Sequence, residues 1–198
     1  MTATVGADES PRRKGESNRL QSNAVDCFCF GRRAMKILGI DGSLRGTGLA
    51  VIEWEGNHGR AVHGEVVKVP ASAAHSECLR RIRERVDALL AEHGVESAAI
   101  EAGFCFKNSK VSLVLGEVRG VAISCCAAAG VPVHEYAPRR AKQNITGWGA
   151  APKEQVARMV QMLLGMRREE MDDNITDAFA IALCHAHALK SVAGTEPL

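Results

Sequence analysis

The sequence predicts an α/β fold in which a mixed β-sheet is flanked by helices on both faces. Three strand-like segments follow one another between residues 36 and 69, which predicts an antiparallel meander. After residue 75, helical segments alternate with short apolar segments of the kind that parallel sheets bury. Together these patterns predict both strand directions in one sheet, with ligands at the carboxyl ends of the parallel strands.

The individual elements follow from hydrophobic period and from glycine and proline positions. The segment 75–94 carries apolar residues at helical spacing and stops at Gly94, and its four arginines are expected on the solvent face. A loop containing Gly147 and Gly149 precedes Pro152, which suits the first position of a helix. The expected strands are 36–41, 48–55, 61–69, 97–101 and 131–136, and the expected helices are 75–94, 111–130, 152–164 and 174–190.

The ends of the chain differ in composition from the segment between them. Residues 1–34 are polar, rich in serine and arginine, and without a sustained hydrophobic period, so we expect a disordered extension. Met35 directly precedes the first strand, so an upstream start assignment is an equal explanation. The domain is expected over 35–190, with a flexible tail over 191–198.

Composition excludes several classes of protein. The net charge is +2, so an anionic partner has to be met by a local basic patch. The seven cysteines lack paired C-x-x-C spacing, which indicates reduced thiols rather than disulfides or structural zinc. No segment approaches the roughly 18 apolar residues of a membrane helix, and the start lacks a signal peptide. We therefore expect a cytoplasmic protein with no membrane association.

Three acidic residues lie beside segments that should be buried. Asp41 closes the first strand, Glu101 closes the strand 97–101, and Asp177 lies near the start of the last helix. Hydrolysis of a phosphodiester by two metal ions requires several carboxylates around ions about 3.5–4 Å apart. An ordinary explanation exists for each residue. With Asn174 as N-cap, Asp177 would occupy the third helical position, close to a capping box.

The residues after Asp41 read GSLRGTG, and such glycines and hydroxyls let a backbone approach a phosphate or ion closely. The same turn is typical of sugar-kinase-type ATPases and of nucleases. Actin-like ATPases usually need two related domains, and this chain is too short for both.

Four segments resemble one family. ILGIDGSLRGTGLAVI, AIEAGFCFKNSKVSLVLGEVRGVAI, VHEYAPRRAKQNITGWGAAPKEQV and DNITDAFAIALCHAH, in this order, resemble the RuvC family of Holliday junction resolvases across 35–190. The resemblance implies a ribonuclease H-like fold, a homodimer, and Mg²⁺-dependent paired nicking of four-way DNA junctions during recombination and repair. It also implies two ions in each active site, Mn²⁺ as a substitute, and a branch-migration complex of the RuvA and RuvB type as partner.

By position, the resemblance makes Asp41, Glu101 and Asp177 metal-binding catalytic carboxylates. The fourth position departs from the family, because Asn174 stands where the family has Asp or His. Asn offers a neutral oxygen that can ligate a hard metal but cannot act as a base. Asp173, four residues before Asp177, is a possible substitute ligand. We expect altered metal affinity rather than inactivity.

Several residues are candidates for binding DNA. Phe104 follows Glu101 in the segment where the family carries an aromatic wedge, although a core phenylalanine is an equal explanation. Lys142 and Lys153 match lysines near the family's active site, where they would position phosphate and stabilise developing charge. The other candidates are Lys107, Arg139 and Arg140, and for the two arginines a solvated loop is an equal explanation.

Some features carry no functional assignment. Gly116 and Gly120 form G-x-x-x-G on a helix, which permits close approach by another helix, within the chain or across a two-fold axis. His185 and His187 lie on different helical faces and are interpreted as structural. Trp148, between two glycines, is unexplained.

Two further functions stay open. A junction-binding architectural protein that lost cleavage through Asn174 would keep the fold and the DNA contacts. A ribonuclease H-like enzyme acting on RNA fits the sheet and carboxylates, but the segments KNSKVSLVLGEVRGVAI and RRAKQN speak against it.

Overall fold

The computed structural model describes residues 33–103, 109–167, 171–189 and 196–198. Five strands and five helices lie in these residues. The strands are β1 (Met35–Asp41), β2 (Gly46–Glu55), β3 (His58–Lys68), β4 (Ser97–Glu101) and β5 (Val133–Tyr136). The helices are α1 (His75–His93), α2 (Ser109–Ala128), α3 (Pro138–Thr146), α4 (Lys153–Leu163) and α5 (Asp173–Ala188).

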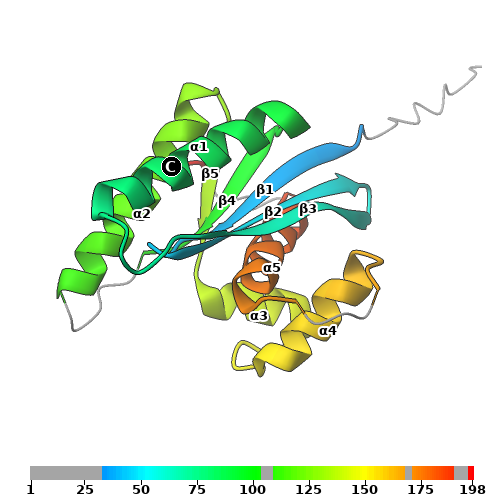
Figure 1. The fold of residues 1–198 in the computed structure, drawn as a ribbon. Coiled ribbons are helices and arrows are strands. Elements are labelled where there is room, and N and C mark those ends of the chain that lie inside the picture. Colours follow the sequence, from blue (N-terminus) through cyan, green and yellow to red (C-terminus); the bar gives the residue numbers. More distant parts are fainter. Residues whose placement is uncertain (1–32, 104–108, 168–170, 190–195) are drawn as a thin grey trace, which may run out of the picture. The chain divides into compact units, whose positions relative to one another are not determined.

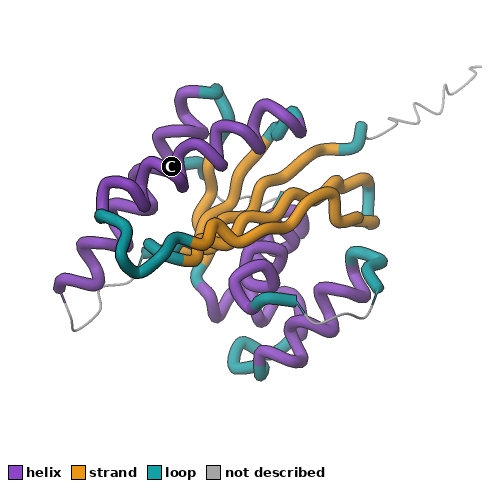
Figure 2. Tube along the Cα trace, in the orientation of Figure 1, coloured by secondary structure: helices purple, strands orange, loops and turns teal. Residues whose placement is uncertain are grey.

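The five strands form one mixed sheet in the order β3-β2-β1-β4-β5. Strands β1, β2 and β3 are an antiparallel meander, while β4 runs parallel to β1 and β5 runs parallel to β4. This arrangement confirms the predicted mixed sheet. Figure 2 shows the strands twisting side by side, with helices above and below them.

The two faces of the sheet carry separate cores. On one face, Leu38 and Ile40 pack with Ile82 and Val86 of α1 and with residues of α2. On the other face, apolar side chains of β1 and β2 pack against α4 and α5 (Figure 1). Successive strand residues point to opposite faces, so neighbouring positions of one strand serve two cores. This is why β1 and β2 read as nearly continuous apolar runs.

Helix α3 is absent from the predicted elements, in which residues 138–146 belong to a loop. Pro138 stands at the start of the helix, and Gly147 ends it with φ at 79°. Only Ala141 and Ile145 of its side chains are buried. Ala141 and Ile145 are four positions apart, as on one helical face, but two apolar residues in a nine-residue segment are too few to identify a helix from the pattern alone.

Helix α2 corrects a second expectation. An 18-residue window of Ser109–Ala128 has a mean hydropathy of 1.6, so this helix has the length and composition of a membrane span, contrary to the prediction that no segment does. Only 22% of the window is buried in the chain. The buried side chains, which include Val118 and Ala122, belong to the core beneath the helix.

Candidate active site

Two of the three predicted carboxylates lie side by side at one edge of the sheet. Asp41 is the last residue of β1 and Glu101 is the last residue of β4. The strands are parallel, and Ile40 is in register with Ile100, so the next residue of each strand brings the two acids together. The side chains of Asp41 and Glu101 share a hydrogen bond.

Two glycines let α5 deliver the third carboxylate. Gly48 of β2 is in register with Asp41, and a Cβ at Gly48 would lie 2.0 Å from the backbone oxygen of Asn174. A Cβ at Gly39 would lie 2.0 Å from the backbone oxygen of Ala178. No side chain fits at either position, so the first turns of α5 rest directly on β1 and β2. This close packing places Asp177 beside the strand ends.

The start of α5 differs from the prediction in a way that bears on Asp177. The N-cap is Asp172, whose side chain accepts hydrogen bonds from the backbone N–H of Asn174 at 3.1 Å and from its side-chain amide at 3.0 Å. Asn174 is therefore inside the helix, and Asp177 is in its second turn. The proposal that Asp177 caps the helix is wrong, because Asp172 already does so.

Burial disfavours the ionised form of all three carboxylates. Burial, the charges of Glu101 and Asp177 and the hydrogen bond with Glu101 raise the pKa of Asp41 to about 7. Burial and the charge of Asp177 raise the pKa of Glu101, against the opposing effects of Asp41, Arg119 and Lys142. The pKa of Asp177 is raised by burial too. Such a cluster is stable in its ionised form only with positive charge beside it.

The chemistry of the cluster fits a hard divalent cation, which prefers carboxylate oxygens. Among the described residues, no group of three His, Cys, Asp or Glu side chains has the spacing of a preformed metal site. Ligand groups would come from Asp41, Glu101 and Asp177.

The two alternative ligands lie at the edge of this cluster. Asp173 has a 62% exposed side chain and forms an ion pair with Lys153 at 2.8 Å. Asn174 directs its amide nitrogen to Asp172, which in turn lies 3.3 Å from the ammonium of Lys68. Each side chain thus already has a partner outside the three carboxylates.

Three cationic side chains lie close to the carboxylates. Lys142 on α3 and Lys153 on α4 both lower the pKa of Asp177, against the larger effect of burial. The unexpected member is Arg119 of α2, which donates a hydrogen bond to the backbone oxygen of Glu101 and forms an ion pair with Glu135 at 2.8 Å. Its side chain is only 18% exposed. A charge inside the otherwise apolar stretch 118–128 was the signal in the sequence that could have identified it.

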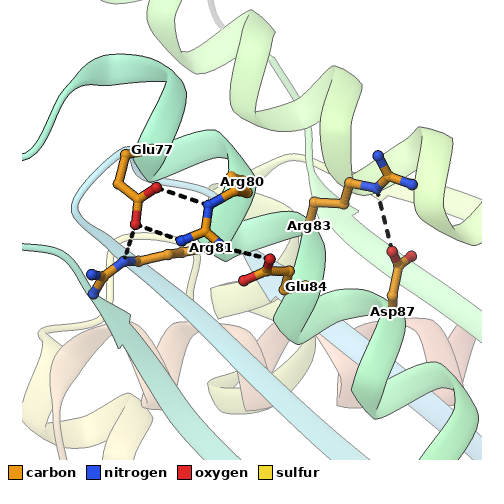
Figure 3. Close-up of polar contacts among 6 residues, drawn as sticks. All are labelled: Glu77, Arg80, Arg81, Arg83, Glu84 and Asp87. Carbon is orange, nitrogen blue, oxygen red and sulfur yellow. Dashed lines mark hydrogen bonds and ion pairs between the residues drawn. The ribbon is translucent and has the colours of Figure 1, made fainter.

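Basic residues are paired on one side of the molecule and unpaired on the other. On α1, Arg80 and Arg81 contact Glu77, and Arg83 contacts Asp87 (Figure 3). The solvent-face interpretation of these arginines is therefore confirmed. By contrast, four basic residues on α3 and α4 form no ion pair with a described residue, since no carboxylate lies within 4.0 Å of their charged nitrogens. They are Arg139, Arg140, Lys142 and Arg158.

A buried hydrogen-bond network supports the site from within. His185 of α5 is 1% exposed and lies 2.8 Å from the hydroxyl of Tyr136 and 2.7 Å from the hydroxyl of Ser97. Burial, reinforced by the charge of His134, lowers the pKa of His185 to about 4. The structural interpretation of His185 is confirmed. The predicted DNA contacts Phe104 and Lys107 lie outside the described residues.

Comparison with known proteins identifies the family. The family model described as crossover junction endodeoxyribonuclease RuvC matches residues 37–185. Proteins of that name from Halorhodospira halophila and Maricaulis maris are 43% and 44% identical to this chain, over 77% and 78% of it and 90% and 92% of their own lengths. The structure of Thermus thermophilus RuvC in complex with a Holliday junction substrate matches with a TM-score of 0.77 at 34% identity, over 83% of this chain and 99% of the other. These matches confirm the ribonuclease H-like fold.

Proposed function

The chain belongs to the RuvC family of crossover junction endodeoxyribonucleases, and from this premise we propose that it resolves four-way DNA junctions by paired, symmetric nicks. The observation that carries the proposal is the convergence of Asp41, Glu101 and Asp177 beside Lys142 and Lys153. Acidic and basic side chains meet there at one edge of the sheet.

Enzymes of this family depend on a divalent metal, and we propose Mg²⁺, with Mn²⁺ as a substitute and two ions in each site. Bound there, the metal would activate water and stabilise the charge that develops on the phosphate. The carboxylates of Asp41, Glu101 and Asp177 would hold it.

The chain's own cations act on the substrate. Lys142 would hold a phosphate oxygen of the strand to be cut, because it has no ion-pair partner among the described residues. Lys153 would exchange Asp173 for the phosphate, since an exposed ion pair is worth only about 0–1 kcal/mol. Arg119 would fix the backbone of Glu101 and leave that carboxylate free to bind metal. Phe104, Lys107, Arg139 and Arg140 are proposed to hold the DNA around this point.

We expect the second metal position to be the weaker one. Asn174 contributes no charge, and its amide is bound to Asp172. Asp173 is a substitute only if it leaves Lys153. The expected result is cleavage that needs more Mg²⁺ than an enzyme with four acidic ligands, because each carboxylate adds attraction for the cation.

A homodimer is supported by the surface of α2. A Cβ at Gly116 or Gly120 would meet no atom within 4 Å, so the intramolecular explanation for this motif is wrong within the described residues. Val111 and Leu113 are 42% and 65% exposed on the same helix. Farther along α2, a groove of about 570 Å³ lies between α1 and α2 and is lined by Leu79, Gly120, Val121 and other residues. Two copies joined here would present two sites to two opposed strands.

The dimer has its own test. Sedimentation of the full chain at micromolar concentration is expected to give twice the mass of one chain. Gly116→Leu and Gly120→Leu fill the open helix surface and are expected to shift the protein toward the monomer. Sedimentation as a monomer by the unsubstituted chain would contradict the proposed interface.

The cleavage test uses the full chain and an end-labelled four-way junction in Mg²⁺, beside linear duplex of the same sequence. Paired nicks at symmetric positions in the junction only are expected, and Asp41→Asn and Asp177→Asn should abolish them. The branch-migration partners of the RuvA and RuvB type and a cytoplasmic location remain predictions.

A second candidate is the junction-binding architectural protein, and Asn174 is the observation that favours it. Under this alternative the chain would bind the junction tightly and leave it uncut in both Mg²⁺ and Mn²⁺. That result would remove the enzyme assignment while keeping the DNA-binding surface of α3 and α4.

A further inference from the structure

Trp148 stands out on the turn that joins α3 to α4. Its side chain is 58% exposed, and it is the one aromatic residue among the large hydrophobic side chains exposed in the described part of the chain. Exposing more than half of this residue forgoes part of the burial that usually stabilises a large apolar side chain by about 2 kcal/mol. The active site described above makes no use of this ring.

The backbone around Trp148 is held firmly. Its N–H donates to the hydroxyl of Thr146 at 3.2 Å, and its carbonyl oxygen accepts from the N–H of Ala151 at 3.1 Å. Thr146 in turn donates to the carbonyl oxygen of Lys142 at 2.8 Å. A Cβ at Gly149 would lie 2.6 Å from Cγ of Arg139, so the turn lies directly against that side chain. The backbone that carries the ring is therefore in place before a partner arrives, which lowers the entropy cost of binding.

The surroundings of the ring are cationic. The turn links the helix that carries Lys142 to the helix that carries Lys153, and both lysines lie close enough to Asp177 to lower its pKa. Arg139 and Arg140 begin α3 with no carboxylate within ion-pair distance among the described residues. A flat apolar ring near cations, of which Arg139, Arg140 and Lys142 have no carboxylate partner among the described residues, has the chemistry that binds unstacked nucleotides, whose bases stack and whose phosphates are anionic.

We infer that Trp148 stacks on a nucleobase of the strand that enters the active site, next to the phosphate contacted by Lys142 and Lys153. This rests on the proposed function, and it adds a base contact to a site otherwise built for phosphate. The ligand class is an unpaired or splayed deoxynucleotide, because a base within an intact duplex stack offers no free face. Trp148 thereby becomes a positioning residue for the strand to be cut.

The chain provides its own optical probe for this contact. It has two tryptophans, and the other, Trp54, is 7% exposed and packs edge-on against His187 with ring centroids 5.2 Å apart. Emission that changes when DNA is added therefore reports on Trp148. The experiment titrates the full chain with a fluorescently labelled four-way junction in Ca²⁺, which is chosen to limit cleavage, and records protein emission together with anisotropy of the label.

The expected result is quenching of tryptophan emission as the junction binds, and loss of that quenching in Trp148→Phe. The phenylalanine keeps an aromatic face and should retain most of the affinity. Trp148→Ala should weaken binding about 5- to 150-fold, which corresponds to about 1–3 kcal/mol for one stacked base. Met162→Ala is the matched control, because Met162 is 68% exposed on α4 and about 14 Å along the helix from Lys153.

Two results overturn the inference. One is tryptophan emission that stays constant while anisotropy shows the junction saturating. The other is a Trp148→Ala protein that is folded by circular dichroism and binds the junction within twofold of the unsubstituted chain. If the unsubstituted chain binds no junction at all, the proposed function fails and this inference fails with it. If the unsubstituted chain binds and cleaves the junction but its tryptophan emission does not change, the proposed function stands and only the inference about Trp148 is refuted.

Discussion

Replacement of Asp41 by asparagine should make the metal-free protein more stable at neutral pH. Asp41 has its pKa raised from 3.8 to about 7, chiefly by burial and then by Glu101 and Asp177. A carboxyl whose pKa is raised in the folded chain binds its proton more tightly there than in the unfolded chain. Its contribution to the free energy of unfolding is therefore largest at low pH. It is lost as pH rises from 3.8 through about 7.

The size of this effect follows from the interval between the unfolded and the folded pKa of Asp41. At about 1.4 kcal/mol for each pH unit, the interval from 3.8 to about 7 gives an upper limit of about 4 kcal/mol. Asparagine resembles the protonated acid in shape and carries no charge. The two proteins should therefore unfold with similar free energy near pH 4, and the variant should be more stable by up to about 4 kcal/mol at pH 8.

Urea unfolding in EDTA at pH 4, 6 and 8 measures this difference. For a urea dependence of about 2 kcal/mol per molar, the midpoint of the variant at pH 8 should lie up to about 2 M higher. The comparison has to be made between variant and parent at each pH. His185, whose pKa is lowered to about 4, contributes an opposite trend that is common to both, since its stabilisation is lost as pH falls from 6.5 through about 4.

A metal arm and a control complete the experiment. Saturating Mg²⁺ at pH 8 should stabilise the parent by about 3 kcal/mol at a hundred times its dissociation constant, and Asp41→Asn by much less. Asp87→Asn, which removes a 44% exposed carboxylate on α1, should change the free energy of unfolding by less than about 1 kcal/mol. A free-energy difference between parent and Asp41→Asn that stays constant from pH 4 to pH 8 would refute the reasoning.

Three further outcomes are expected. Gly48→Ala should cost about 3 kcal/mol in urea unfolding and at least about 100-fold in cleavage rate, because the added Cβ would displace α5. Asn174→Asp should lower the Mg²⁺ concentration for half-maximal cleavage, and an unchanged requirement would show that Asn174 is a tolerated ligand change. Tyr136→Phe should cost about 1–3 kcal/mol in thermal unfolding by leaving a buried nitrogen of His185 unpaired, and a loss below about 0.5 kcal/mol would contradict this.

The sequence predicted the sheet better than the start of its last helix. The strands were predictable because their apolar runs are continuous, and Asp41 and Glu101 follow from them as strand ends. The cap of α5 was not, since Asp172, Asp173 and Asn174 are all good N-cap residues. In the structure Asp172 is the cap, and the backbone of Asn174 packs against Gly48. When several neighbouring residues are equally good N-caps, the contacts of the folded helix decide which of them is the cap.

The position of Arg119 in an apolar stretch marks it as unusual, but the contact that it makes could not be predicted from the sequence. Its guanidinium reaches the backbone oxygen of Glu101 across the interval between α2 and β4, and no local period encodes such a contact. The pairing of Asp173 with Lys153 likewise joins residues twenty positions apart. Long-range contacts of this kind set the charges and pKa values at the site. The hydrophobic pattern of the sequence predicts only which carboxylates lie at the strand ends.

The ion pairs on α1 have a consequence for how DNA binding depends on salt. An arginine already held by a carboxylate, as Arg80 is by Glu77, displaces few counterions from DNA. The cations proposed to neutralise phosphates are Lys107, Arg139, Arg140, Lys142 and, once it leaves Asp173, Lys153. The logarithm of affinity should therefore fall with the logarithm of salt concentration at a slope of about −4 to −5 for each protomer. The overall charge of the chain is therefore a poor guide to its attraction for DNA, which is set by the few basic groups left unneutralised.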